Sequence, residues 1–167
     1  MVLAVSSLAG CRRSAGPGTG EAAVEWRGGD RGRLTAAAAA DHCPETGVVE
    51  ILAIRGDTGF GLAMFLKDSA VIAPGDYQVF HGATPAASRP GATVGLRWFT
   101  GIDLAAFESN SGTVTVSTVN GGLSGTLTVR MQGVSSSDTL AVTGRMNGVP
   151  VRQAGPGCGR TSRHNIR

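Results

Sequence analysis

The side chains that most often carry out catalysis or bind metals are few in this chain and widely spaced. They are the cysteines and histidines Cys11, Cys43, Cys158, His42, His81 and His164. We expect each of the three histidines to lie at the surface or in a turn. No C-x-x-C pair is present, so a zinc site is not expected. The chain also lacks the G-x-S-x-G elbow of serine hydrolases and a Gly-rich phosphate loop followed by Lys. We therefore expect no catalytic residue, no metal and no cofactor, and predict that the protein is not an enzyme.

One triplet has a catalytic counterpart. Asp57, Thr58 and Gly59 resemble the D-T-G triplet of aspartic peptidases, in which two carboxylates share a proton and activate water. A single copy per chain would require a homodimer. In that family apolar residues precede the Asp, whereas Arg55 and Gly56 precede it here. Gly, Asp and Thr are also common turn residues, so a β-turn is the favoured interpretation and a dimeric peptidase the unlikely alternative.

The first eleven residues, MVLAVSSLAGC, are uncharged and mostly apolar. Their last four, Leu8 to Cys11, resemble the lipobox of bacterial lipoproteins, in which cleavage before the Cys is coupled to its lipidation. The resemblance implies that residues 1–11 form a lipoprotein signal, truncated because its positively charged start is missing. It also implies lipidation of Cys11 and an anchor on the extracytoplasmic face of a bacterial membrane. The alternative is an apolar first strand, Val2 to Leu8, with Cys11 as a core thiol.

The other two cysteines form an even set once Cys11 carries a lipid. Disulfides persist in exported proteins, so we expect a bond between Cys43 and Cys158 that fastens the beginning of the domain to its end. The alternative is two separate buried thiols in a cytosolic protein.

The net charge of +3 is unevenly distributed along the chain. Residues 1–151 hold 11 basic and 12 acidic side chains, whereas Arg152, Arg160, Arg163 and Arg167 follow in the last sixteen residues. We therefore expect a nearly neutral domain and a disordered basic tail at residues 159–167. Nucleic acid is not an expected partner, because the sequence shows no clustering of basic residues with aromatic ones.

Short β-type runs separated by Gly, Pro, Asp, Asn or Ser dominate the rest of the chain, which has 26 Gly and 7 Pro. They predict an all-β domain at residues 23–158, after a flexible linker at residues 12–22. We expect a single antiparallel β-sandwich or flattened barrel of about eight to ten short strands. The expected strands are Ala23–Arg27, Arg33–Ala38, Val48–Arg55, Gly61–Leu66, Asp76–Phe80, Thr93–Phe99, Leu104–Glu108, Thr113–Thr118, Leu123–Met131 and Thr139–Val151.

Two stretches of this pattern need comment. Ala36 to Ala40 is a run of five alanines, which we expect to form either a small-residue strand or a single helical turn leading into Cys43, and the sequence does not decide between the two. The stretch from Ser111 to Val151 resembles the C-terminal part of small secreted or lipid-anchored bacterial β-domains of uncharacterised function, which implies a meander of three strands.

These observations predict a non-enzymatic binding or structural module of the cell envelope, held to the membrane by its lipid. Its partner would be an unknown envelope protein, a glycan or a small ligand. The main alternative is a β-barrel carrier that shelters a small apolar ligand, for which an interior cavity would be needed.

Overall fold

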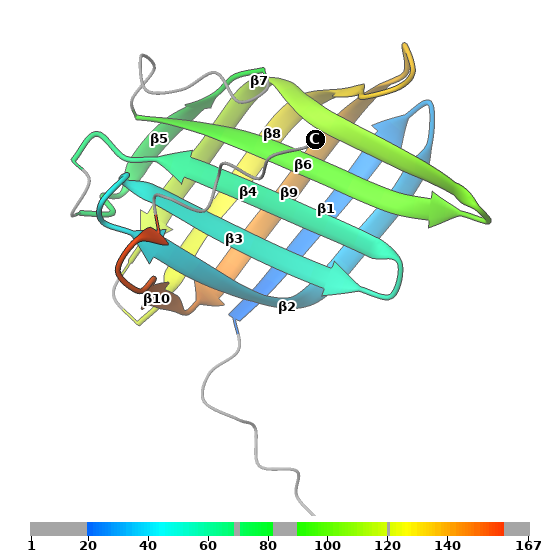
Figure 1. Ribbon diagram of the computed structural model, residues 1–167. Helices are drawn as coiled ribbons and strands as arrows, with labels where there is room; N and C mark the ends of the chain where they lie inside the picture. The colour runs from blue at the N-terminus through cyan, green and yellow to red at the C-terminus, as the bar shows by residue number, and fades with distance from the viewer. Residues whose placement is uncertain (1–19, 69–70, 82–89, 120, 159–167) are drawn as a thin grey trace, which may run out of the picture.

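The computed structural model describes residues 20–68, 71–81, 90–119 and 121–158, and the regular elements of these segments are ten β-strands (Figure 1). No described helix is long and apolar enough to cross a membrane. The strands are β1 (Gly20–Gly28), β2 (Arg31–Cys43), β3 (Val48–Arg55), β4 (Thr58–Phe65), β5 (Gly75–Val79), β6 (Gly91–Thr100), β7 (Asp103–Thr118), β8 (Leu123–Gly133), β9 (Thr139–Val149) and β10 (Val151–Gln153).

Nine of the strands close into a barrel, and β10 is an extra strand. The order runs β1-β9-β8-β7-β5-β6-β4-β3-β2, and β1 also pairs with β2, which completes the ring. Most neighbours are antiparallel, but β5 runs parallel to β6 and β10 runs parallel to β2. The prediction of an all-β flattened barrel is confirmed, and β7, β8 and β9 form the expected meander.

The barrel is flattened into two walls (Figure 1). We call β2, β3, β4 and β6 the front wall, and β1, β9, β8 and the second half of β7 the back wall. Strand β7 joins the two, because its first half pairs with β6 and its second half with β5. A register shift between Ser109 and Ser111 marks the change.

Alternating side chains explain why these segments are strands. In β2 the burial pattern alternates along the alanine run, with Ala36, Ala38 and Ala40 facing the core. The run is therefore a strand, which decides between the two forms that the sequence left open. Small interior residues suit a flattened barrel because they let two walls approach closely.

Larger side chains fill the other end of the interior. Trp26 of the back wall stacks on Trp98 of the front wall with ring centroids 5.1 Å apart, and Trp98 stacks on Phe107 at 5.2 Å. A Cβ atom on Gly32, which pairs with Trp26, would overlap the Trp26 ring. Glycine is therefore needed opposite this tryptophan, and the two walls are in direct contact here.

Several strand boundaries differ from those expected. Strand β1 begins at Gly20, inside the expected linker, because β1 continues its pairing with β2 as far as Ala38. The two runs expected as Leu104–Glu108 and Thr113–Thr118 are one bent strand, β7. The expected last strand is divided by Pro150, since Val151–Gln153 pairs with β2 instead of β8.

A disulfide joins Cys43, at the end of β2, to Cys158, with the Cα atoms 5.8 Å apart. The same segment is held by a hydrogen bond from the Gly157 amide to a carboxylate oxygen of Glu45 at 2.9 Å. The predicted pairing of the two cysteines is therefore confirmed. Cys11, the linker residues 12–19 and the basic tail lie outside the described residues.

Candidate functional site

The D-T-G triplet lies in a β-hairpin. Strand β3 ends at Arg55 and β4 begins at Thr58, so Gly56 and Asp57 form a two-residue turn. Gly56 has a φ of 56°, as tight hairpins require, and Asp57 is exposed. The geometry agrees with the turn interpretation of this motif.

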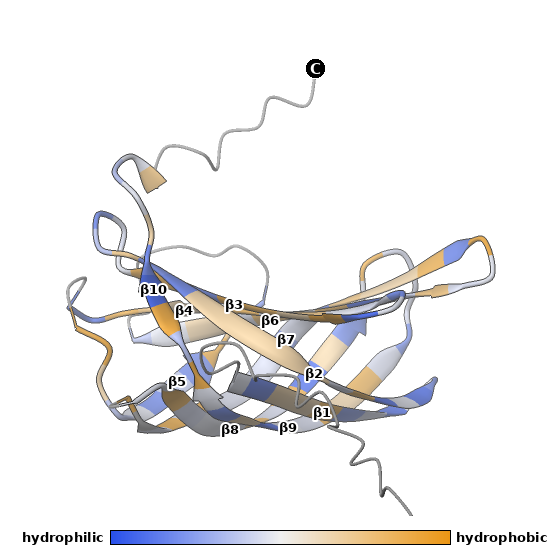
Figure 2. Ribbon diagram, turned by 90° about the horizontal axis from the view of Figure 1, so that it is seen from below, coloured by the Kyte–Doolittle hydropathy of each residue, from blue (hydrophilic) through white to orange (hydrophobic). Residues whose placement is uncertain are grey.

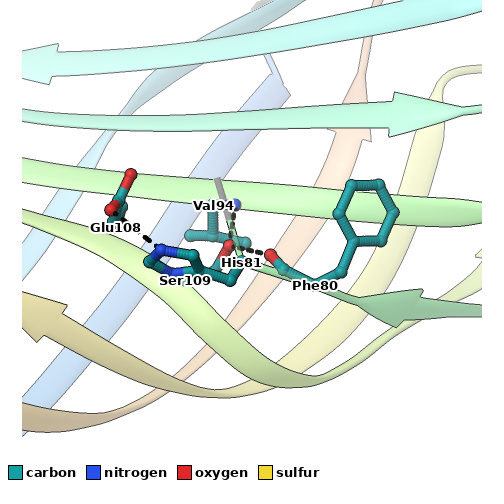
Figure 3. Close-up of polar contacts among 5 residues, drawn as sticks. All are labelled: Phe80, His81, Val94, Glu108 and Ser109. Carbon is teal, nitrogen blue, oxygen red and sulfur yellow. Dashed lines mark hydrogen bonds and ion pairs between the residues drawn. The ribbon is translucent and has the colours of Figure 1, made fainter. Parts of the chain in front are cut away.

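The histidines occupy different environments. His42 is buried in β2 with 4% of its surface exposed, so the expectation of a surface or turn histidine is wrong for this residue. His81 is exposed and lies 3.5 Å from a carboxylate oxygen of Glu108, an arrangement shown in Figure 3. His164 lies outside the described residues.

Ser109 is the buried polar residue beside that pair, at the point where β5 separates β6 from β7 (Figure 3). Its hydroxyl accepts a hydrogen bond from the Val94 amide at 3.0 Å and donates one to the Phe80 carbonyl at 2.8 Å. The Ser109 hydroxyl therefore provides hydrogen bonds for the Val94 amide and the Phe80 carbonyl at the point where the strands separate. This role is structural, and the sequence analysis did not single out Ser109.

The barrel interior is packed with side chains from both walls. Its members are almost all apolar, and the stacked Trp26 and Trp98 bridge the space between β1 and β6. The indole N–H of Trp26 is buried and has no hydrogen-bond acceptor among the described residues. An interior of this kind offers a ligand neither space at the aromatic end nor convergent polar groups.

Polar side chains gather instead on the outside, where β9, β1, β2 and β3 lie next to one another. We call this site the arginine depression. It is a shallow hollow of about 590 Å³ lined by Ala23, Val24, Glu25, Arg33, Thr35, Arg55, Thr143, Gly144 and Arg145.

The strand register explains how the arginine depression forms. On β1, Ala23 lies between Thr35 of β2 and Arg145 of β9, and the next outward residue, Glu25, lies between Arg33 and Thr143. The small Ala23 side chain leaves a floor that longer side chains surround.

Arg55 reaches the arginine depression from the end of β3. Its guanidinium donates a hydrogen bond to the Thr35 carbonyl at 3.4 Å. Neither Arg33 nor Arg145 forms an ion pair with any described residue. Three guanidinium groups and a single carboxylate, that of Glu25, therefore line the same hollow.

The five strands in and beside the arginine depression carry six arginines and four exposed acidic residues, Glu21, Glu25, Asp41 and Glu50. The described residues include nine Lys or Arg and twelve Asp or Glu, so this part of the chain is acidic overall. Six of those nine cations nevertheless lie on the outer side of β1, β2, β3, β8 and β9. They are Arg27, Arg31, Arg33, Arg55, Arg130 and Arg145.

This cluster was not predicted from the sequence, because charge counted along the chain does not show which strands lie side by side. Arg145 is remote in sequence from Arg33, and the two approach only because β1 pairs with both β2 and β9. The alternating Arg31 and Arg33 at the start of β2 were a local signal, since residues two apart in a strand share a face.

The front wall has a different outer surface. Leu52 and Ile54 of β3 are more than half exposed, and between β3 and β6 stand the small residues Gly61 and Ala63 of β4. The hairpin between β6 and β7 projects beyond the barrel and bears the 97% exposed Ile102 at its tip (Figure 2).

Comparison of the chain with protein families, with curated proteins and with solved structures found no match. The arginine depression is therefore interpreted from its own chemistry.

Proposed function

We propose that this protein is a non-enzymatic binding module of the bacterial cell envelope, held at the extracytoplasmic face of a membrane by a lipid on Cys11. In this proposal the filled barrel is a rigid scaffold, and ligands bind to its outer surface. The arginine depression carries the proposal, because unpaired guanidinium groups around a hollow are a typical recognition surface for anions.

The disulfide supports the proposed location. A bond between Cys43 and Cys158 persists in an oxidising compartment and is rare in the cytosol. The lipobox resemblance of Leu8 to Cys11 supports the same location independently, since it rests on different residues.

The two alternative functions have less support. A carrier of an apolar ligand needs interior space, and the contact of Trp26 with Trp98 occupies it at one end. A peptidase needs two Asp57 side chains in a shared, enclosed site, and Asp57 is exposed on a hairpin turn.

The location is tested by the intact mass of the protein made in a bacterial host, with upstream codons included, and purified from membranes in detergent. The expected mass corresponds to cleavage before Cys11, addition of acyl chains and loss of two protons for the disulfide. A matched Cys11→Ser variant should lose the acyl chains and leave the membrane fraction. An unprocessed, soluble chain with three free thiols would contradict the proposal.

A further inference from the structure

We propose that the arginine depression binds the phosphate group of a phosphate ester. This inference deepens the proposed binding function and rests on it. It does not depend on the lipid anchor, because every residue that carries it belongs to the described barrel.

The charge of the hollow favours phosphate over a carboxylate. One Arg can satisfy a carboxylate through two parallel hydrogen bonds, whereas a phosphate ester offers more acceptor oxygens and up to two negative charges. Arg33, Arg55 and Arg145 together supply more positive charge than Glu25 neutralises. Three forked donors around one small hollow therefore match a group with several oxygens.

The shape of the hollow favours a small head group. Ala23 forms the floor between β2 and β9, so a ligand can approach the sheet closely while the long arginine side chains close around it. The hydroxyls of Thr35 and Thr143 add neutral donors at the rim. No aromatic side chain lines the hollow, so base stacking would not contribute and a nucleic acid is disfavoured.

The ligand can come from two sources with the same chemistry, a soluble phosphate ester or the head group of an anionic phospholipid. The first arm of the test uses glycerol 3-phosphate, with acetate as the carboxylate control. The full-length chain carries Cys11→Ser to prevent lipidation and is labelled with 15N for NMR titration. We expect saturable amide shifts around Ala23, Thr35 and Thr143 with glycerol 3-phosphate and much weaker shifts with acetate.

The decisive variant is Arg33→Gln combined with Arg145→Gln. It should raise the Kd for glycerol 3-phosphate by about tenfold or more, because two charge-assisted hydrogen bonds are lost. The matched control is Arg97→Gln combined with Arg152→Gln, which removes the same charge from outside the arginine depression and should leave the Kd within about twofold. Glu25→Gln should lower the Kd, since it removes the one carboxylate of the hollow.

The second arm measures cosedimentation with phosphatidylglycerol vesicles, with phosphatidylcholine vesicles as the control. If both glycerol 3-phosphate and phosphatidylglycerol vesicles bind, and the Arg33/Arg145 variant binds neither, the site recognises phosphate groups in general. If only the phosphatidylglycerol vesicles bind, the ligand is a lipid head group. The proposal is overturned if neither probe binds, or if the two double variants weaken binding equally. The mass measurement above does not involve these arginines, so failure of the phosphate site leaves the envelope proposal standing.

Discussion

The two walls of the barrel share one interior, but much of their outer surfaces differs in character. The back wall alternates buried apolar residues with outward Thr, Arg and Glu, as along β1 and β9. The front wall contributes Arg33 and Arg55 to the arginine depression next to β1, but over β3 and β4 it exposes Leu52 and Ile54 beside glycines and alanines. Because folding depends mainly on the side that faces the core, the outer sides can differ without a change of fold. The proposed binding function accordingly uses the outer surface and not the shared interior.

The glycines of the two walls differ in the same way. A Cβ atom on Gly125 of β8 would overlap the carbonyl oxygen of Thr115, and one on Gly144 would press on Val24. On the front wall, Gly61 and Gly95 have open space where a Cβ atom would stand. Glycine is therefore required for close packing at Gly125 and Gly144 of the back wall, as it is at Gly32 beside Trp26, whereas Gly61 and Gly95 of the front wall have no such contact.

The largest expected effect comes from breaking the contact between the walls. Trp98→Ala removes a 9% exposed ring that touches both Trp26 and Phe107, and should lower the free energy of unfolding by about 3 to 5 kcal/mol. Urea unfolding monitored by circular dichroism measures the change. The control is Phe99→Ala, where the neighbouring ring is 53% exposed, with an expected change within about 0.5 kcal/mol. Equal losses in the two variants would show that the walls do not depend on this contact.

The second effect concerns the disulfide, which ties the C-terminal segment to the front wall. Replacing both Cys43 and Cys158 by Ser opens a loop with a sequence separation of 115 residues. Loop-closure entropy predicts a loss of about 4 to 5 kcal/mol as an upper value, and about 2 to 5 kcal/mol is typical of native disulfides. Thermal unfolding of the double variant should show a lower Tm, whereas Cys11→Ser should leave it unchanged. An unchanged Tm in the double variant would show that the disulfide does not stabilise the fold.

A pair of glycine substitutions sharpens the contrast between the walls. Gly125→Ala forces β8 away from β7 and should cost about 1 to 3 kcal/mol, the usual range for overpacking. Gly61→Ala should instead be neutral or add up to about 1 kcal/mol, because it restricts the unfolded chain without a clash. The midpoint of urea unfolding should therefore fall for Gly125→Ala and stay level or rise for Gly61→Ala, and a similar fall in both would contradict the open space at Gly61.

The smallest effect is a pH dependence at β5, where the walls meet. Burial raises the pKa of Tyr77 above the ordinary 10.0, although its hydrogen bond to the Ala73 carbonyl at 2.9 Å acts in the opposite direction. The folded protein therefore keeps the phenol proton at a pH where the unfolded chain has released it. The stability from this residue is complete below about pH 10 and falls as the pH rises through the folded pKa.

Absorbance at 295 nm reports this titration directly, because Tyr77 is the single tyrosine of the chain. The midpoint in the folded protein should lie above the midpoint in denaturant. A midpoint at or below the denatured value would mean that the ring is solvated.

Local pattern was enough to predict most of the strands. The alternation in β8 and β9 identified both as strands, whereas the alanine run of β2 was left open between a strand and a helical turn. The pairing of Cys43 with Cys158 followed from cysteine arithmetic and not from geometry. These features depend on residues that are close in sequence or on simple counting.

Closure and the arginine depression could not be predicted in that way. Both depend on β1 lying between β2 and β9, a register set by packing across the whole barrel. The insertion of β5 parallel to β6 is equally nonlocal, and it accounts for the buried Ser109. The burial of His42 was also not predicted. Strand β2 continues beyond the alanine run as far as Cys43, so His42 lies within a strand and not in a turn.

Closure of the barrel also bears on how the protein behaves when it is crowded. Open sheet edges recruit strands from neighbouring molecules, and a closed ring leaves none for such pairing. Here β1 is paired on both sides, and the extra strand β10 is only three residues long and lies beside the Cys43–Cys158 bond. Molecules concentrated side by side would therefore resist aggregation through strand exchange, and their contacts would involve side chains in place of backbone.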